Sequence, residues 1–201
     1  PVPFSLGEIK ENLTITTRAP AKPSKEKIIN QAFKFQSQGN TSEAAKYYRY
    51  FIDQGFNDHR VYSHYGEILK DNGKLHEAEK YLRKAIKLNS YNSNDRKNLG
   101  SILIQYGQLD EAKIETEKAI ELNPNFDKAH LNLGVIFRSK GQLKEAEIST
   151  RKAIEINPDF AMAHSNLGNV LKDLGQLQEA EISTRRAIEI NPDFAEAHYN
   201  L

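Results

Sequence analysis

The sequence has 201 residues, of which 38% are hydrophobic and 27% are charged, and its formal net charge is +1. A charge so close to balance gives no general attraction to nucleic acid or to acidic membranes. No apolar run approaches the roughly 20 residues that a membrane-spanning helix needs. Cysteine is absent, which excludes disulfides and thiolate chemistry. Because no secretory signal is recognisable at the start, we expect a cytoplasmic protein.

An N-terminal arm, residues 1–24, lies outside the pattern that organises the rest of the chain. Prolines near both of its ends favour extended or turn-like backbone there. Between them, capping-box spacing from Ser5 to Glu8 and apolar residues at helical intervals predict one short helix near residues 6–12. Two interpretations stay open: a partly disordered arm, or an arm that docks its apolar face on the first repeat or on a neighbouring chain.

A block of 34 residues recurs in register along the remaining chain. The two clearest copies of this block are residues 127–160 and 161–194. Both contain Asn-Leu-Gly at the same place, and both end in Asn-Pro-Asp-Phe. Self-similarity at such a fixed period indicates a stacked-repeat architecture. The predicted units are residues 25–58, 59–92, 93–126, 127–160 and 161–194, with the start of a sixth unit at residues 195–201.

Each unit is predicted to contain two helices. In the copy at residues 127–160, Leu133 and Phe137 share one face of the first helix. Gly141 then interrupts the pattern, and Pro158 ends the second helix because proline cannot continue a helix interior. The unit is therefore a helix–turn–helix block.

Small and capping residues refine this prediction. Gly134 and Ala146 are small where we expect the two helices of a unit to cross closely, since a larger side chain would push them apart. Ser24 or Pro23 is predicted to open the first unit, Asn40 to cap its second helix, and Asp159 to cap the helix that begins the fifth unit.

These residues and their offsets resemble the tetratricopeptide repeat (TPR) family, whose units are about 34 residues long. The Leu-Gly pair, the aromatic after it, two alanines and the closing proline all match, whereas Thr150 stands where an aromatic residue is usual. The resemblance implies an all-α fold, a right-handed TPR superhelix or α-solenoid of antiparallel helix pairs. It also implies a concave groove, lined by the first helix of each unit, that binds an extended peptide or a helix of a partner protein.

One polar position recurs immediately before each Leu-Gly pair or its equivalent. It holds Asn30, His64, Asn98, Asn132, Asn166 and Asn200. The position lies roughly opposite the core-facing residues, so we expect these side chains to point into the groove. An asparagine amide offers donors and an acceptor that match a peptide bond. The series resembles the asparagine ladder of the TPR superhelix in O-GlcNAc transferase, which holds protein substrates this way; the alternative is that asparagine is common here and has no effect.

Two other recurring features do not predict sites. His130, His164 and His198 are one repeat apart, too far to share one ion, so we expect packing residues and no metal site. Lys97 lies at an offset like that of a lysine in the carboxylate clamp of some TPR domains, but Ser101 stands where that clamp has asparagine. A clamp is therefore not supported.

No catalytic constellation is visible in the sequence. It lacks a cysteine nucleophile and a glycine-rich phosphate loop after a strand, and we expect its carboxylates on exposed helix faces where nothing shifts their pKa. We therefore expect a non-catalytic protein–protein interaction scaffold without a cofactor, with a protein or peptide as its partner. Two alternatives are a substrate-recruiting arm of a larger enzyme of the glycosyltransferase or sulfotransferase type, because the chain stops inside a repeat, and a solenoid that self-associates end to end.

Overall fold

The computed structural model describes residues 24–200, which form eleven helices and no strand. The prediction of an all-α fold is confirmed. The short helix predicted near residues 6–12 lies outside the described residues. By its contacts the chain divides into an N-terminal unit, Pro1–Phe56, and a C-terminal unit, Asn57–Leu201. No helix in the described part is long and apolar enough to cross a membrane.

The described part of the N-terminal unit is one helix pair. Its helices are α2 (Lys25–Ser37) and α3 (Thr41–Asp53). The Oγ of Ser24 accepts a bond from the N–H of Lys27 at 3.4 Å, and the Oδ1 of Asn40 accepts one from the N–H of Glu43 at 3.2 Å. The predicted cap at Asn40 is confirmed, and each of the two bonds satisfies a backbone donor that the first turn of a helix leaves unpaired.

Aromatic side chains fill the space between α2 and α3. Tyr48 and Phe51 are fully buried, and the hydroxyl of Tyr48 donates to Oε1 of Gln36 at 2.5 Å. The rings of Phe35 and Tyr47 lie 5.4 Å apart between centroids. Buried aromatic rings contribute a large apolar area, so these contacts hold the two helices together.

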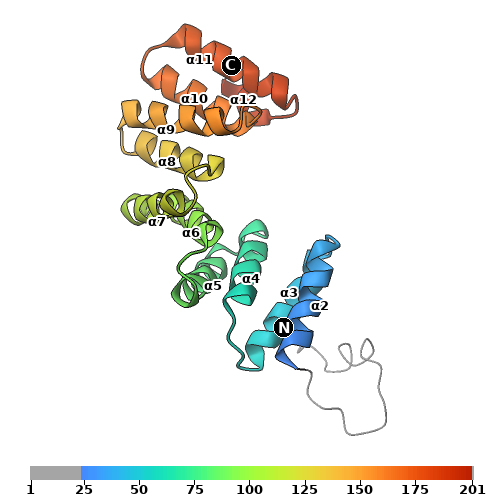
Figure 1. Ribbon diagram of the computed structural model, residues 1–201. Coiled ribbons are helices and arrows are strands. Elements are labelled where there is room, and N and C mark those ends of the chain that lie inside the picture. The colour runs from blue at the N-terminus through green and yellow to red at the C-terminus, as the bar shows by residue number, and fades with distance from the viewer. Residues whose placement is uncertain (1–23, 201) are drawn as a thin grey trace, which may run out of the picture. The chain divides into compact units, whose positions relative to one another are not determined.

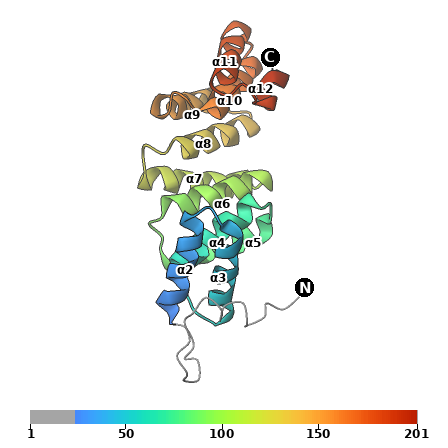
Figure 2. The ribbon, with the colours of Figure 1, turned by 90° about the vertical axis from the view of Figure 1, so that its right-hand side faces the viewer.

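The C-terminal unit continues the same design. Its helices are α4 (His59–Asp71), α5 (Leu75–Leu88), α6 (Ser93–Gln105), α7 (Leu109–Leu122), α8 (Asp127–Ser139), α9 (Leu143–Ile156), α10 (Ala161–Asp173), α11 (Leu177–Ile190) and α12 (Ala195–Asn200). Each even-numbered helix from α4 to α10 packs against the next helix in the chain, and the pairs stack from α4 to α12 (Figures 1 and 2). The exact boundaries of the five predicted repeats stay a prediction.

Glycine reverses the chain inside each pair. Gly73, Gly107, Gly141 and Gly175 have φ between 70° and 77°. This left-handed conformation is costly for a residue with a side chain, and it turns the first helix into the second within three residues. The predicted break at Gly141 is confirmed.

The two helices of a pair cross closely at a second kind of glycine. A Cβ built on Gly134 would overlap Oγ1 of Thr150 and would lie 3.3 Å from the carbonyl oxygen of Ala146. Thr150 itself is buried, and its hydroxyl donates to that same carbonyl at 2.8 Å. The predicted close crossing is confirmed, and the threonine that replaces an aromatic residue fits against the glycine.

The predicted cap at Asp159 is wrong. Helix α10 starts at Ala161, its N-cap is Phe160, and no side chain caps it. The preceding turn closes through the backbone instead, because the N–H of Phe160 donates to the carbonyl of Asn157 at 3.2 Å. The carboxylate of Asp159 points elsewhere and lies 3.3 Å from Nη2 of Arg186.

The stack in the C-terminal unit has an inner and an outer side. Helices α4, α6, α8, α10 and α12 each contact the next helix of that series, and we call them the inner row. Helices α5, α7, α9 and α11 make no comparable contacts with one another among the described residues, and we call them the outer row. Because its members lie closer together, the inner row is on the concave side of the stack.

Candidate functional site

The predicted site residues fall on two separate parts of the structure. Asn30 is exposed on α2 of the N-terminal unit. The others lie on successive helices of the inner row: His64 on α4, Asn98 on α6, Asn132 on α8, Asn166 on α10 and Asn200 on α12. The structure therefore brings five of the six residues onto one side of the C-terminal unit.

Asn132 and Asn166 are half-buried, and the side-chain Oδ1 of each remains available to accept a hydrogen bond. The Nδ2 of Asn132 donates to the carbonyl of Lys97 on α6 at 3.3 Å, and Nδ2 of Asn166 donates to Oγ1 of Thr150 at 3.3 Å. Among the described residues, Oδ1 of neither asparagine accepts a hydrogen bond. The two amides thus present a repeated carbonyl oxygen along the inner row.

The two ends of the series differ from its middle. His64 is half-buried on α4, and burial lowers its pKa, so its ring stays neutral at neutral pH. Nδ2 of Asn200 approaches Oγ of Ser165 on α10 at 3.5 Å, a longer contact than those in the middle. Asn132 and Asn166 therefore make shorter side-chain contacts with neighbouring helices than Asn200 does.

Asn98 is closed off by lysines. Only 2% of it is exposed, and its Oδ1 accepts from Nζ of Lys70 at 3.0 Å and from Nζ of Lys97 at 2.7 Å. The Oδ1 of Asn98 is therefore already occupied, unlike that of Asn132 or Asn166. The sequence pattern had placed all three asparagines in one series of equivalent positions.

A buried carboxylate on α6 was missed by the sequence analysis. Asp95 is fully buried, Ser63 donates to its Oδ1, and its Oδ2 has no hydrogen-bond partner among the described residues. Burial raises the pKa of Asp95 to about 6. The expectation that every carboxylate is exposed is wrong here. A signal was present, since the equivalent positions one and two repeats away hold Val61, Ala129 and Ala163.

The repeated histidines have a backbone role. The Nε2 atoms of His130 and His164 lie 2.9 Å from the carbonyl oxygens of Pro124 and Pro158. Each ring therefore fastens the turn that leads into its own helix. Within residues 24–200, no group of three His, Cys, Asp or Glu side chains is placed to hold a metal ion.

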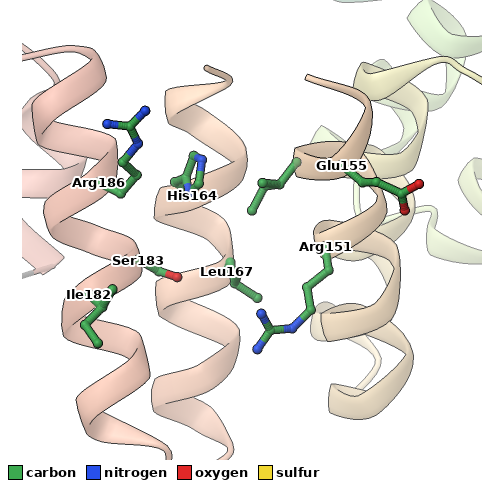
Figure 3. Close-up of a pocket in the computed structure, with 8 residues that line it drawn as sticks. Arg151, Glu155, His164, Leu167, Ile182, Ser183 and Arg186 are labelled. Atoms are coloured by element: carbon green, nitrogen blue, oxygen red, sulfur yellow. The ribbon is translucent and has the colours of Figure 1, made fainter. Parts of the chain in front are cut away.

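A pocket of about 380 Å³ lies between α9, α10 and α11 (Figure 3). Ile154 and Leu167 give it an apolar lining, and Arg151 extends beside Leu167 into the space between α9 and α10 (Figure 3). Arg151 is already paired, with carboxylate oxygens of Glu147 at 2.9 Å and Glu179 at 3.0 Å. Two of the three helices that line the pocket, α9 and α11, belong to the outer row. The carboxylates of Glu147 and Glu179 compensate the charge of Arg151.

Models of one family match most of the C-terminal unit. Models described as tetratricopeptide repeat or TPR repeat match residues 59–92, 98–126, 116–148, 134–175 and 161–194. In a comparison with curated proteins, no sequence matches this one.

Solved structures with the same fold cover most of the chain. The crystal structure of YrrB is 24% identical, covers 96% of this chain and 95% of its own, and has a TM-score of 0.71. MamA from Desulfovibrio magneticus RS-1, from its residue 41 to the end, is 20% identical, with coverages of 87% and 99% and a TM-score of 0.72. TTC0263 from Thermus thermophilus is 16% identical, with coverages of 88% and 96% and a TM-score of 0.67. The predicted solenoid of helix pairs is confirmed.

Proposed function

The chain belongs to the tetratricopeptide repeat family, and on this premise we propose that it is a non-catalytic protein-interaction scaffold. Its C-terminal unit binds an extended segment of a partner protein along the inner row. The observation that carries the proposal is the pair of half-buried asparagines, Asn132 and Asn166, whose Oδ1 atoms accept no hydrogen bond in the described part of the chain.

The spacing of these two side chains suits an extended backbone. They occupy equivalent places on α8 and α10, which are adjacent helices, and packed helices lie about 8–10 Å apart. An extended chain rises about 3.3 Å per residue, so equivalent groups on the two helices meet roughly every third residue. Each Oδ1 can accept one backbone N–H of the segment. Such contacts hold a backbone without depending on its side chains.

An extended segment is favoured over a bound helix. Backbone N–H groups inside a helix are already bonded to its own carbonyls, so they cannot donate to Asn132 or Asn166. The N–H groups of an extended segment are available. The relative YrrB is described as a TPR protein with an unusual peptide-binding site, which supports a peptide as the class of ligand.

The pocket between α9, α10 and α11 supports a binding site less well. Its guanidinium groups are engaged, since Arg186 contacts Asp159 at 3.3 Å and Glu189 at 3.1 Å, as Arg151 contacts its own carboxylates. An acidic ligand would have to displace these partners. The inner row instead offers polar groups that need no rearrangement.

Affinity capture with paired variants tests the proposal. The Asn132→Ala/Asn166→Ala variant removes both acceptors, and the matched control Asn72→Ala/Asn125→Ala removes two exposed asparagines that lie outside the helices. Partners captured by the wild type are identified and their affinities measured.

Each lost hydrogen bond contributes about 0.5–1.5 kcal/mol, so we expect the first variant to bind about tenfold more weakly or worse and the control to bind normally. Circular dichroism verifies that both variants keep the wild-type helicity. Equal binding by all three proteins, at equal helicity, contradicts the proposal.

A further inference from the structure

A row of basic side chains lies on the outward side of α5, a helix of the outer row. Lys80, Lys84 and Lys87 are exposed, and their spacing along the sequence places them on one face of the helix. That face is opposite the buried residues Ala78 and Leu82, which pack toward the core. We call Lys80, Lys84 and Lys87 the lysine face.

The positive charge of the lysine face is poorly compensated. In the described part of the chain, no carboxylate oxygen lies within 4.0 Å of any of its three ammonium groups. Helix α5 has two carboxylates of its own. Glu79 pairs with Arg83 at 2.8 Å, whereas Glu77 lies on the side of the lysines and pairs with none of them. A single carboxylate beside three ammonium groups leaves an excess of positive charge.

Aromatic rings position two of these lysines where a carboxylate would otherwise be expected. Nζ of Lys84 lies 5.3 Å from the centroid of the Tyr62 ring and 5.7 Å from that of the Tyr81 ring. Nζ of Lys80 lies 5.6 Å from the centroid of the Tyr81 ring. A ring face attracts an ammonium group but does not neutralise its charge or use all three of its N–H donors. The lysines are therefore held in place and can still bind an anion.

The other pairs of the C-terminal unit compensate the equivalent charge. At the place of Lys84, each of the next three outer helices has a basic residue with a carboxylate of the same helix beside it. These are Lys118 with Glu115 at 3.3 Å, Lys152 with Glu155 at 2.8 Å, and Arg186 with Glu189 at 3.1 Å. On α5 the places of those carboxylates are occupied by Tyr81 and Lys87. The excess charge is thus particular to α5 and is not a general property of the repeat.

The helix dipole explains only one of the three lysines. Cations are favourable near the C-terminal end of a helix, and the effect falls off within the last turn. Lys87 lies in the last turn of α5. Lys80 and Lys84 lie further from that end, so the dipole does not account for them.

We propose that the lysine face is a second protein-binding surface, separate from the inner row, and that it binds an acidic helix of a partner protein. Residues of a helix rise about 1.5 Å each, so the three lysines are about 6 Å and 4.5 Å apart along α5. Carboxylates at matching intervals on an antiparallel helix lie opposite all three. Side chains on one face of an extended strand recur about every 6.6 Å, which does not match the shorter step. The side chain of Leu88 is 54% exposed and adds an apolar contact beyond Lys87.

A protein helix is favoured over nucleic acid or an anionic membrane because the basic surface is narrow. Helix α7 lies beside α5, since Arg83 of α5 pairs with Glu111 of α7 at 2.7 Å. Helix α7 has five acidic and two basic residues. A helix with its side chains is about 10–12 Å wide, and a nucleic acid duplex or a bilayer surface is wider than that. Either one would cover α7 as well and meet its excess of carboxylates.

Nuclear magnetic resonance titration of the full, isotope-labelled chain tests the proposal. The probe is an acetylated, amidated, alanine-based helical peptide with three glutamates, spaced to face Lys87, Lys84 and Lys80 in that order, and a leucine just before the first glutamate. The comparison peptide has glutamine in place of each glutamate. Exposed ion pairs are individually weak, so we expect the acidic peptide to bind weakly but about fivefold or more tightly than the glutamine peptide at low salt. Its shift changes should be concentrated on α5.

Matched variants separate the lysine face from net charge. Lys80→Gln/Lys84→Gln/Lys87→Gln removes the face, and the preference for the acidic peptide should fall below about twofold. The control Lys118→Gln/Lys144→Gln/Arg185→Gln removes the same number of positive charges from exposed positions on α7, α9 and α11, and it should keep the preference. Lys80→Arg/Lys84→Arg/Lys87→Arg retains the charges and should also keep it. Circular dichroism verifies that all three variants have the wild-type helicity.

Several results would overturn the inference. The wild type could bind both peptides equally or neither of them, or the shift changes could fall on the inner row instead of α5. Loss of the preference in the α7, α9 and α11 control would show that net charge alone is responsible. Tighter binding of a thymidine oligonucleotide or of phosphatidylserine vesicles than of the acidic peptide would identify a polyanion as the occupant and would contradict the choice of a protein. The capture experiment decides the proposed function separately, since its variants leave α5 unchanged.

Discussion

At single positions, the buried polar groups of the repeat core differ in whether a neighbour bonds them. Thr150 and Thr184 are buried, and their hydroxyls donate to the carbonyls of Ala146 and Ala180. In the described residues two buried side-chain atoms lack a partner, Oδ2 of Asp95 and Oγ1 of Thr116. Unbonded buried polar atoms lower stability, so these two positions give sharp tests of the packing.

Replacing Asp95 by asparagine should stabilise the protein at neutral pH. The pKa of Asp95 is about 6 in the folded protein, above its ordinary value of 3.8. The folded state thus binds the proton more tightly, and the stability that this provides is present below pH 4 and is lost as pH rises through about 6. At pH 7.5 the buried charge is unfavourable, and Asp95→Asn should gain about 1–3 kcal/mol.

Thermal unfolding of Asp95→Asn and the wild type at two pH values checks this. The variant should have the higher midpoint at pH 7.5, and the gap should shrink at pH 4.5, where the wild-type carboxyl is already protonated. A gap that is the same at both pH values, or a variant that is less stable at pH 7.5, would contradict the burial of a charged Asp95.

Thr116 and Thr150 form a matched pair for a second test. Both are buried at equivalent places, but only the hydroxyl of Thr150 has a partner. Thr116→Val should therefore raise stability by up to about 1 kcal/mol, whereas Thr150→Val should lower it by about the same amount. Urea unfolding measures both, and equal effects of the two substitutions would show that the hydroxyl contacts do not matter.

Among the helices, each pair depends on its close crossing. Gly134 lies inside α8, where alanine would ordinarily stabilise a helix by about 1 kcal/mol. Here the added Cβ would meet Oγ1 of Thr150 and the carbonyl of Ala146, which are fixed to α9. We expect Gly134→Ala to destabilise the protein by about 1–3 kcal/mol, the range for overpacked cores.

The sign of the Gly134→Ala effect is diagnostic. Ser139→Ala, at the exposed end of the same helix, is the control and should change stability by less than about 0.5 kcal/mol. Thermal unfolding followed by circular dichroism compares the two. A stabilised Gly134→Ala variant would mean that α8 and α9 are not in tight contact.

The helices were predictable from the sequence because their signals are local and repeated. The turn at Gly141 and the cap at Asn40 each depend on a few adjacent residues. The cap at Asp159 failed because the backbone closes that turn without a side chain, and the sequence does not show which donor is already bonded.

The candidate site was less predictable because its members differ through contacts between units. Asn98 and Asn132 occupy equivalent positions in their repeats. Lys70, which lies 28 residues before Asn98, donates to Oδ1 of Asn98, whereas Oδ1 of Asn132 accepts no hydrogen bond among the described residues. A periodic pattern identifies the helix and the face, and it does not report which side chain a neighbouring helix brings. The burial of Asp95 was missed for the same reason, although alanine at the equivalent positions is a usable signal.

For the molecule as a whole, the C-terminal unit should fold without the N-terminal one. Residues 57–201 form a compact unit with four complete helix pairs, more than the roughly three that a stable solenoid needs. Such arrays are stabilised by contacts between nearest neighbours. A fragment of residues 57–201 should keep a helical circular dichroism spectrum and a cooperative thermal transition. A fragment that is unfolded at 25 °C would show that the first 56 residues are required.

The central claim is that the partner lies along the inner row, and cysteine footprinting measures this directly. Because the chain has no cysteine, single variants can be alkylated at one chosen place. Asn132→Cys and Asn166→Cys report on the inner row, and Ile148→Cys and Ile182→Cys report on the outer row, where the isoleucines are 70% and 67% exposed. Alkylation rates are compared with and without a saturating amount of the captured partner. We predict slower alkylation at positions 132 and 166 and unchanged rates at 148 and 182; protection at 148 and 182 alone would contradict the account.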